Sequence, residues 1–236
     1  MGEERIGRET FQMIRVNIIV EGQTEETFVR DVLAPHLGNL QIVISVRCVE
    51  TGRKNNKIFR GGMTSYLKAK RDLLNWIKQD RNAYFTTMFD LYRLPGDFPG
   101  MKTTERFADP YQRVAFIERE FALDINEEHF IPYIQLHEFE ALLLTEPSKF
   151  NVYYFDRSKE IKILEQLCAE YQTPEHINDG EDTAPSKRIA NLIPEYTTAK
   201  DVAGPIIAQA IGLTKLRYEC RHFNEWLERL ENLRLL

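Results

Sequence analysis

The most informative stretch of this chain reads Val16-Asn17-Ile18-Ile19-Val20-Glu21-Gly22-Gln23-Thr24-Glu25-Glu26. Its first five residues are mostly apolar and β-branched and are too few to span a membrane, so they predict a strand buried on both faces. We expect Gly22 to allow a tight turn and Thr24 to cap a helix that begins with Glu25 and Glu26. Glu21 then lies at the carboxyl end of a buried strand, where open α/β sheets place their chemistry.

The three acids of this stretch differ in the roles that the sequence suggests for them. Glu25 and Glu26 either compensate the helix dipole or belong to a site, and for Glu26 we favour the dipole. Glu21 stands between a strand and a turn and has no helical role, so we favour a functional role for it.

Composition limits the protein class. The chain has 236 residues, 43% of them hydrophobic, which is enough for one sizeable core or for a core with a helical annex. The formal net charge of −5 provides no overall attraction to nucleic acid, so such contacts would need a local basic patch, but it does not exclude a nuclease. Three widely spaced cysteines predict reduced thiols and a cytoplasmic protein. Since no apolar run approaches the length of a membrane span, we expect no contact with a membrane.

Three more apolar runs predict strands at residues 40–49, 83–89 and 130–136, separated by helical patterns. The helix after the first strand should end at Pro35, and Pro132 indicates a strand at or near a sheet edge. From about Lys159 the pattern is helical, with expected helices over 186–192, 204–211 and 216–233. The sequence therefore predicts an α/β fold with a mostly parallel sheet and a C-terminal α-helical annex. It is expected to be one domain, residues 1–236, with a core at 14–150 and a helical extension at 151–236.

Acids follow the later strands as well. Asp90 ends the third predicted strand, and Glu138 and Glu140 follow the fourth, where a helix starting near His137 would leave only one of these two acids facing a site. Asp97 is either a site acid or a turn former, and we favour the turn. Because parallel strands end at one sheet edge, we expect Glu21, Asp90 and Glu138 or Glu140 to converge. Such a set suits Mg²⁺ or Mn²⁺ and hydrolysis of phosphodiesters.

Two basic segments are candidates for phosphate binding. Arg53, Lys54 and Lys57 lie in residues 52–62, which predict a flexible loop that either contacts phosphates or is only solvated. Lys187 and Arg188 follow a predicted helix start at Pro185-Ser186, and they either bind an anion or pair with the nearby acids of residues 179–182.

Several of these motifs resemble known families. Val20-Glu21-Gly22-Gln23-Thr24-Glu25 is similar to the glutamate signature of TOPRIM domains, which occur in topoisomerases, primases and overcoming-lysogenization-defect nucleases. The chain from Arg15 to Trp226 more specifically resembles the bacterial family catalogued as domain of unknown function 4276. That resemblance is carried by Val20 to Glu25 and by Phe89-Asp90-Leu91-Tyr92, the turn at 94–100, the run at 137–142 and the segment at 177–188.

The resemblance implies a TOPRIM-like, mostly parallel sheet with Glu21 and Asp90 as metal-linked acids and Glu21 in proton transfer. This sequence departs from the paired-aspartate signature of TOPRIM domains, because the second position after Asp90 is Tyr92. Glu138 or Glu140 would have to supply the missing ligand. Relatives of this family are known beside ATPases and in suspected phage defence, so the resemblance implies an ATPase partner.

The sequence thus predicts a Mg²⁺-dependent nuclease. Its expected catalytic residues are Glu21, Asp90 and Glu138, and its expected metal ligands are Glu21, Glu25, Asp90, Glu138 and Glu140. A different hypothesis is a regulatory or binding subunit that keeps the scaffold without the chemistry and acts through the ATPase partner. Hydrolysis of a small phosphorylated molecule is a third hypothesis.

Overall fold

The computed structural model describes residues 13–54, 57–60, 63, 65–177, 180 and 182–233, with only the backbone described at 50–54, 57–60 and 105. Its central sheet has the order β2-β1-β5-β6, β7 also pairs with β5, and every pair in it is parallel. The strands are β1 (Ile14–Val20), β2 (Ile42–Cys48), β3 (Glu50–Lys54), β4 (Lys57–Arg60), β5 (Tyr84–Asp90), β6 (Phe130–Ile131) and β7 (Ile134–Gln135). The predicted α/β class with a parallel sheet, flanking helices and C-terminal helices is confirmed.

Ten α-helices and several short 3₁₀ or π segments surround the sheet in the described part of the chain. The α-helices are α1 (Gln23–Phe28), α2 (Ala34–Asn39), α3 (Tyr66–Gln79), α4 (Pro110–Ile125), α5 (Glu140–Leu143), α6 (Ser158–Cys168), α7 (Pro185–Leu192), α8 (Tyr196–Ile211), α9 (Leu213–Glu219) and α10 (Arg221–Glu231). The other segments are η1 (Val29–Leu33), η2 (Leu91–Arg93), η3 (Met101–Arg106), η4 (Pro147–Val152) and η5 (Pro174–His176).

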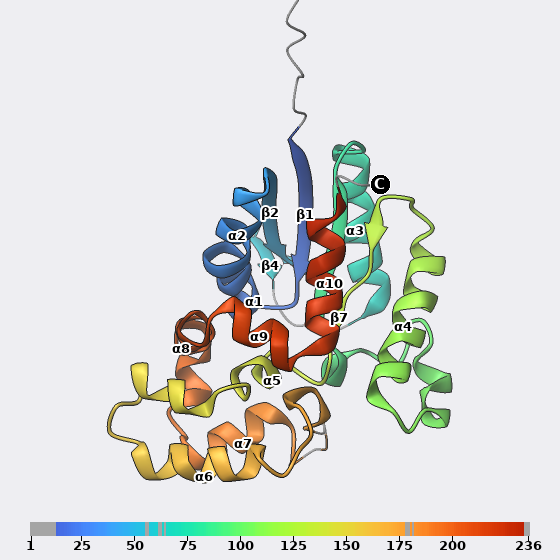
Figure 1. Cartoon of the computed structure of the whole chain (residues 1–236). Helices are drawn as coiled ribbons and strands as arrows, with labels where there is room; N and C mark the ends of the chain where they lie inside the picture. The colour runs from blue at the N-terminus through green and yellow to red at the C-terminus, as the bar shows by residue number, and fades with distance from the viewer. Residues whose placement is uncertain are drawn as a thin grey trace, which may run out of the picture.

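Strand β1 is buried on both faces, as its apolar run predicts. Ile18 and Val20 pack into one hydrophobic cluster, whereas Ile19 packs into the other. The first cluster takes side chains from α1 and α10, and the second takes them from α3 and α4. Figure 1 shows α10 in front of the strands and α1 and α2 beside β2. The alternating side chains of β1 thus hold the two layers together.

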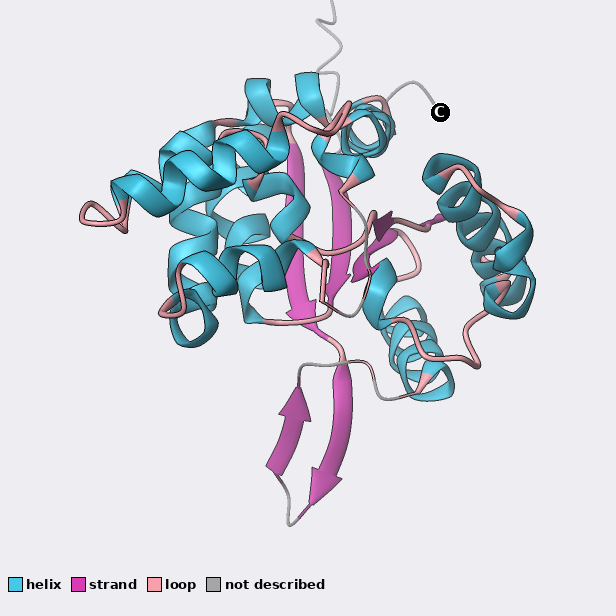
Figure 2. Cartoon of the chain, turned by 90° about the horizontal axis from the view of Figure 1, so that it is seen from below, coloured by secondary structure: helices cyan, strands magenta, loops and turns pink. Residues whose placement is uncertain are grey.

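In the predicted flexible loop at 52–62, residues 52–54 and 57–60 form strands instead, and the other residues lie outside the described ones. Strands β3 and β4 form an antiparallel hairpin in which Lys54 pairs with Lys57. Figure 2 shows this hairpin projecting from the body of the molecule. Backbone pairing across a short connection does not require an apolar period, so a charged segment can form strands that composition conceals.

Two prolines behave differently from each other. Pro35 does not end a helix, because α1, η1 and α2 follow one another without a break and the π-helix η1, with its wider turn, lies directly before Pro35. Pro132 does mark the edge strand, since it falls between β6 and β7, which both pair with β5. Pro132 has no backbone N–H to donate to the neighbouring strand, so it divides the predicted fourth strand in two.

The C-terminal helices share a core with the sheet. Helix α8 begins at Tyr196, earlier than the predicted Gly204, and the predicted helix 216–233 is divided into α9 and α10 around Cys220. The indole of Trp226 stacks on the ring of Tyr133 with centroids 4.2 Å apart and donates to Thr86 Oγ1 at 2.9 Å. None of the described helices combines the length and the apolar character that crossing a membrane requires.

Candidate functional site

A cavity of about 430 Å³ opens at the carboxyl edge of the sheet. Six acidic and two cationic residues line it, together with small polar residues. The acids are Glu21, Glu25, Asp90, Glu138, Glu140 and Asp201, and the cations are Arg93 and Lys200. The structure therefore brings together all five acids that the sequence suggested as metal ligands.

The end of β1 supplies two of these carboxyl groups. Glu21 follows the strand directly and accepts the backbone N–H of Asp90 at 3.4 Å. The N-cap of α1 is Gly22 rather than Thr24, and no side chain caps the helix. Gly22 is extended, with φ −145°, so it is not needed for an unusual turn. A Cβ at Gly22 would lie 3.1 Å from Glu25 Oε2, so this glycine leaves space for the buried carboxyl group of Glu25.

The end of β5 is joined to the segment after β7. Asp90 accepts the backbone N–H of Phe139 at 3.0 Å, and the N–H of Tyr92 donates to the carbonyl of His137 at 2.9 Å. His137 has φ 61°, a left-handed conformation that is uncommon for a residue with a side chain. Because of this turn, no helix starts near His137, and α5 begins only at Glu140. Both Glu138 and Glu140 line the cavity.

The C-terminal helices hold these last two acids. Glu138 accepts the backbone N–H of Ser186 at 2.8 Å and its hydroxyl at 3.0 Å. Ser186 lies in the first turn of α7, so the predicted anion site at that helix start is taken by a carboxylate of the chain itself. Glu140 accepts the hydroxyl of Tyr196 at 3.2 Å.

Four acids of the cavity have raised pKa values. Burial, and then repulsion from Glu140 and Glu21, raise the pKa of Glu25 to about 7. Burial and four neighbouring carboxylates raise the pKa of Asp90 well above its ordinary value. Burial is also the main cause of the raised pKa values of Glu21 and Glu140. The cavity is therefore a place where positive charge is strongly favoured.

Sequence reasoning missed both cations of the cavity. Burial opposes the charge of Lys200, but the carboxylates Glu140, Glu25 and Asp90 still raise its pKa. Within the described residues, neither Lys200 nor Arg93 forms an ion pair. Arg93 follows Asp90 at the end of β5, so its place at the carboxyl edge of the sheet could have been predicted from the sequence. No local pattern connects Lys200 or Asp201 with this edge.

The basic residues expected to bind phosphate lie elsewhere. Lys187 and Arg188 do not line the cavity, and Arg188 donates to the carbonyl of Thr183 and to the hydroxyl of Tyr171. The side chains of Arg53, Lys54 and Lys57 are outside the described residues, although their backbone forms the β3–β4 hairpin.

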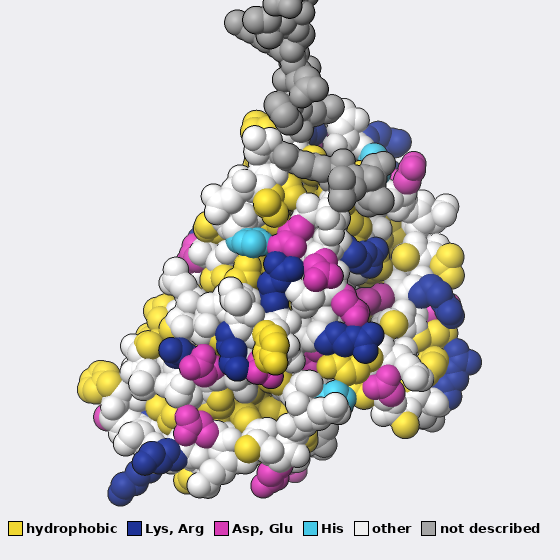
Figure 3. Space-filling model, viewed as in Figure 1, with side chains coloured by type: hydrophobic (Ala, Val, Ile, Leu, Met, Phe, Trp, Pro, Cys, Tyr) yellow, Lys and Arg dark blue, Asp and Glu magenta, His cyan; other side chains and the backbone are white. Residues whose placement is uncertain are grey.

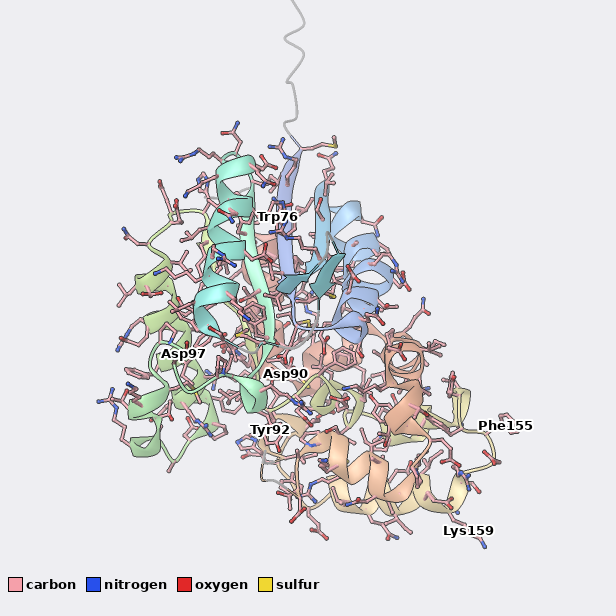
Figure 4. All side chains as sticks on the ribbon, turned by 180° about the vertical axis from the view of Figure 1, so that it is seen from behind. Trp76, Asp90, Tyr92, Asp97, Phe155 and Lys159 are labelled. Carbon is pink, nitrogen blue, oxygen red and sulfur yellow. The ribbon has the colours of Figure 1, made fainter. Side chains whose placement is uncertain are left out.

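Asp97 and His222 have structural roles. Asp97 accepts the backbone N–H of Tyr66 at the start of α3. Figure 4 places Asp97 in the segment beside α4, away from Asp90 and Tyr92. His222 is buried, with its Nε2 3.0 Å from Glu118 Oε1 and its ring stacked on Tyr133.

The carboxyl groups are not already arranged as a metal-ion centre. In the part of the chain that the structure describes, no group of three or more His, Cys, Asp and Glu residues is positioned to hold a metal ion. Glu21, Asp90, Glu138 and Glu140 instead accept hydrogen bonds from protein donors. Side-chain rotations would be needed to direct several of these oxygens at one point.

Comparisons with known proteins give a family and no further relative. A family model described as "Domain of unknown function (DUF4276)" matches residues 20–231. No curated protein matches the chain, and neither does any solved structure. The matched region begins at the end of β1 and includes every residue that lines the acidic cavity. Because the model covers most of its length, this chain belongs to the DUF4276 family.

Proposed function

We propose that this chain hydrolyses phosphodiester bonds in DNA or RNA with the help of Mg²⁺ or Mn²⁺ bound in the acidic cavity. The observation that carries the proposal is the convergence of Glu21, Glu25, Asp90, Glu138 and Glu140 in one cavity at the carboxyl edge of a parallel sheet. This convergence has no evident structural purpose, since buried like charges destabilise a fold unless a cation compensates them.

The carboxylate groups of the cavity are suitable ligands for a hard divalent cation. Carboxylate oxygens are the ligands that Mg²⁺ and Mn²⁺ prefer. Burial raises the pKa values of Glu21, Asp90 and Glu140, and neighbouring carboxylates add to the shift for Asp90 and Glu140. Bound there, the ion would stabilise the attacking and leaving oxygens of the displaced phosphate.

The chain's own groups would have distinct tasks. Glu21 uses Oε2 to accept the N–H of Asp90, and its raised pKa suits proton exchange with an attacking water. Asp90 is oriented by the N–H of Phe139, so its second oxygen remains available. Arg93 and Lys200 would attract the phosphate, because both line the cavity as cations.

A second candidate function is a binding subunit without chemistry that acts through an ATPase partner. The observation that favours it is that the acids already accept protein hydrogen bonds and are not arranged around a common point in the described residues. In that case the cavity would be a polar structural centre, and Tyr92 would stand where the nuclease signature has its second aspartate.

The test is cleavage of plasmid DNA, single-stranded DNA and tRNA with Mg²⁺ or Mn²⁺. Cleavage should be lost in Glu21→Gln and Asp90→Asn and kept in the exposed controls Glu165→Gln and Asp156→Asn. A second readout needs no activity: Mn²⁺ should raise the melting temperature of the wild type more than that of Asp90→Asn. Two results together would favour the binding subunit. No polymer would be cleaved, even with an ATPase encoded beside the gene and ATP supplied, and Mn²⁺ would raise the melting temperatures of the wild type and of Asp90→Asn equally.

A further inference from the structure

Two arginines and two phenylalanines form a cluster on the surface of α4 and the segment before it. The guanidinium carbon of Arg106 lies 4.8 Å from the ring centre of Phe107 and 4.6 Å from that of Phe116. The guanidinium carbon of Arg119 lies 5.0 Å from the ring centre of Phe116, and the two rings are 5.1 Å apart. We propose that this arginine–phenylalanine cluster binds a single-stranded nucleic acid outside the acidic cavity. The inference rests on the proposed function and specifies its substrate.

Chain topology places the cluster toward the same edge of the sheet as the cavity. Strand β5 ends at Asp90, and the chain then passes through η2 and η3 to the start of α4. Since β6 is parallel to β5, α4 must run back along the sheet, and its first turn lies at the same edge as the cavity. Phe116 follows Pro110 by about 9 Å of helix, so it lies within two turns of this edge.

The charges of the cluster are only partly compensated. Arg119 pairs with Glu120 at 2.9 Å, but Arg106 makes no hydrogen bond or ion pair with the described residues. Two guanidinium groups thus converge on the ring of Phe116 with one described carboxylate beside them. Figure 3 shows Lys and Arg side chains along the edge of the molecule that α4 forms. A phosphate would relieve the repulsion between Arg106 and Arg119 and satisfy the N–H groups of Arg106.

The planar groups of the cluster favour an unpaired strand. Arg106 and Arg119 are exposed and lie over aromatic rings, so they offer flat cationic surfaces on which bases can stack. A duplex keeps its base faces inside the helix and can present only phosphates to such a surface. Interleaved aromatic and cationic side chains are typical of proteins that bind single strands without sequence preference.

The experiment measures the binding of a fluorescent oligothymidylate of about twelve nucleotides, a length within the usual range of single-strand sites, to the full chain in the presence of a chelator. The double variant Arg106→Gln/Arg119→Gln should weaken binding about tenfold and should reduce the slope of log Kd against log salt by about 1.4. Arg30→Gln is the matched control, because Arg30 is 59% exposed and pairs with its neighbour Asp31, just as the 64% exposed Arg119 pairs with Glu120. It should bind like the wild type.

Three results would overturn the inference: no binding by the wild type, an equal loss in Arg30→Gln, or a duplex of the same length bound as tightly as the single strand. The chelator separates this test from the proposed function. Binding that depends on Arg106 and Arg119 in a protein that cleaves nothing would support the cluster and remove the hydrolase. If the double variant cleaves single strands with the same KM and binds them with the same Kd as the wild type, the proposed hydrolysis is supported and the role of the cluster is overturned.

Discussion

Glu25 shows at the residue scale how the cavity links proton binding to stability. Its pKa rises from 4.5 unfolded to about 7 folded, so between these values the folded state binds more protons than the unfolded state. Its contribution to the free energy of unfolding is therefore complete below pH 4.5 and is lost as the pH rises through 7. The full shift corresponds to about 3 kcal/mol.

We predict that Glu25→Gln makes the metal-free protein less sensitive to pH. Between pH 5 and pH 8 the wild type should lose more unfolding free energy than the variant, because glutamine fills the same space and never ionises. The measurement is urea unfolding followed by tryptophan fluorescence in the presence of a chelator. The exposed Glu165→Gln serves as the control. Equal pH dependence of wild type and Glu25→Gln would contradict the prediction.

Gly204 determines how closely α8 approaches α1. A Cβ at this position would lie 3.0 Å from Thr24 Cγ2 and 3.3 Å from the ring of Phe139, and neither neighbour has a flexible end that can move aside. We predict that Gly204→Val destabilises the protein by about 1 to 3 kcal/mol through overpacking. Gly38→Ala, a helical glycine with open space around it, should instead stabilise by about 0.5 kcal/mol. Chemical denaturation of both variants tests this, and similar effects of the two changes would refute it.

At the scale of elements, the start of α10 depends on one buried acid. The carboxylate of Glu175 accepts the backbone N–H groups of His222 and Phe223 at 3.0 and 3.1 Å and the hydroxyl of Tyr111 at 2.9 Å. Glu175 is fully buried in the sequence-distant segment η5, so it fixes α10 to both η5 and α4.

We predict that Glu175→Ala costs about 3 kcal/mol or more of unfolding free energy, because it leaves the buried N–H groups of His222 and Phe223 without an acceptor and removes one partner of the Tyr111 hydroxyl. Glu225→Ala on α10 removes an exposed ion pair with Arg221 and should cost about 0.5 kcal/mol. Urea denaturation curves of the two variants provide the comparison. A cost below 1 kcal/mol for Glu175→Ala would show that water replaces the carboxylate.

At the scale of the whole molecule, the sheet depends on helices from the end of the chain. Phe28 packs against Phe223 with ring centres 6.2 Å apart, and Trp226 covers Tyr133. We predict that a fragment of residues 13–150 lacks cooperative unfolding, since it would expose these fully buried rings. Near-ultraviolet circular dichroism during thermal unfolding tests this, with the full chain as control. A sharp transition in the fragment would show that the sheet region is an independent core.

The sequence was informative where a local pattern has a local cause. The β-branched run of β1 forms the predicted buried strand, and Glu21 and Asp90 lie at the ends of β1 and β5 as predicted. The β3–β4 hairpin was mispredicted because backbone pairing does not depend on an apolar period. The late start of α5 was missed because the left-handed turn at His137 is enforced by contacts with Tyr92 and Glu175.

By itself, the sequence determined the parallel α/β architecture and the identity of the five carboxylates, since strand ends of a parallel sheet meet at one edge. Only the tertiary structure decided that Glu138 and Glu140 both face the cavity and that Ser186 and Tyr196 hold them. It also placed Lys200 opposite the acids, because α8 packs on α1 at Gly204. These are contacts between segments far apart in the chain, and their geometry depends on packing that no local pattern encodes.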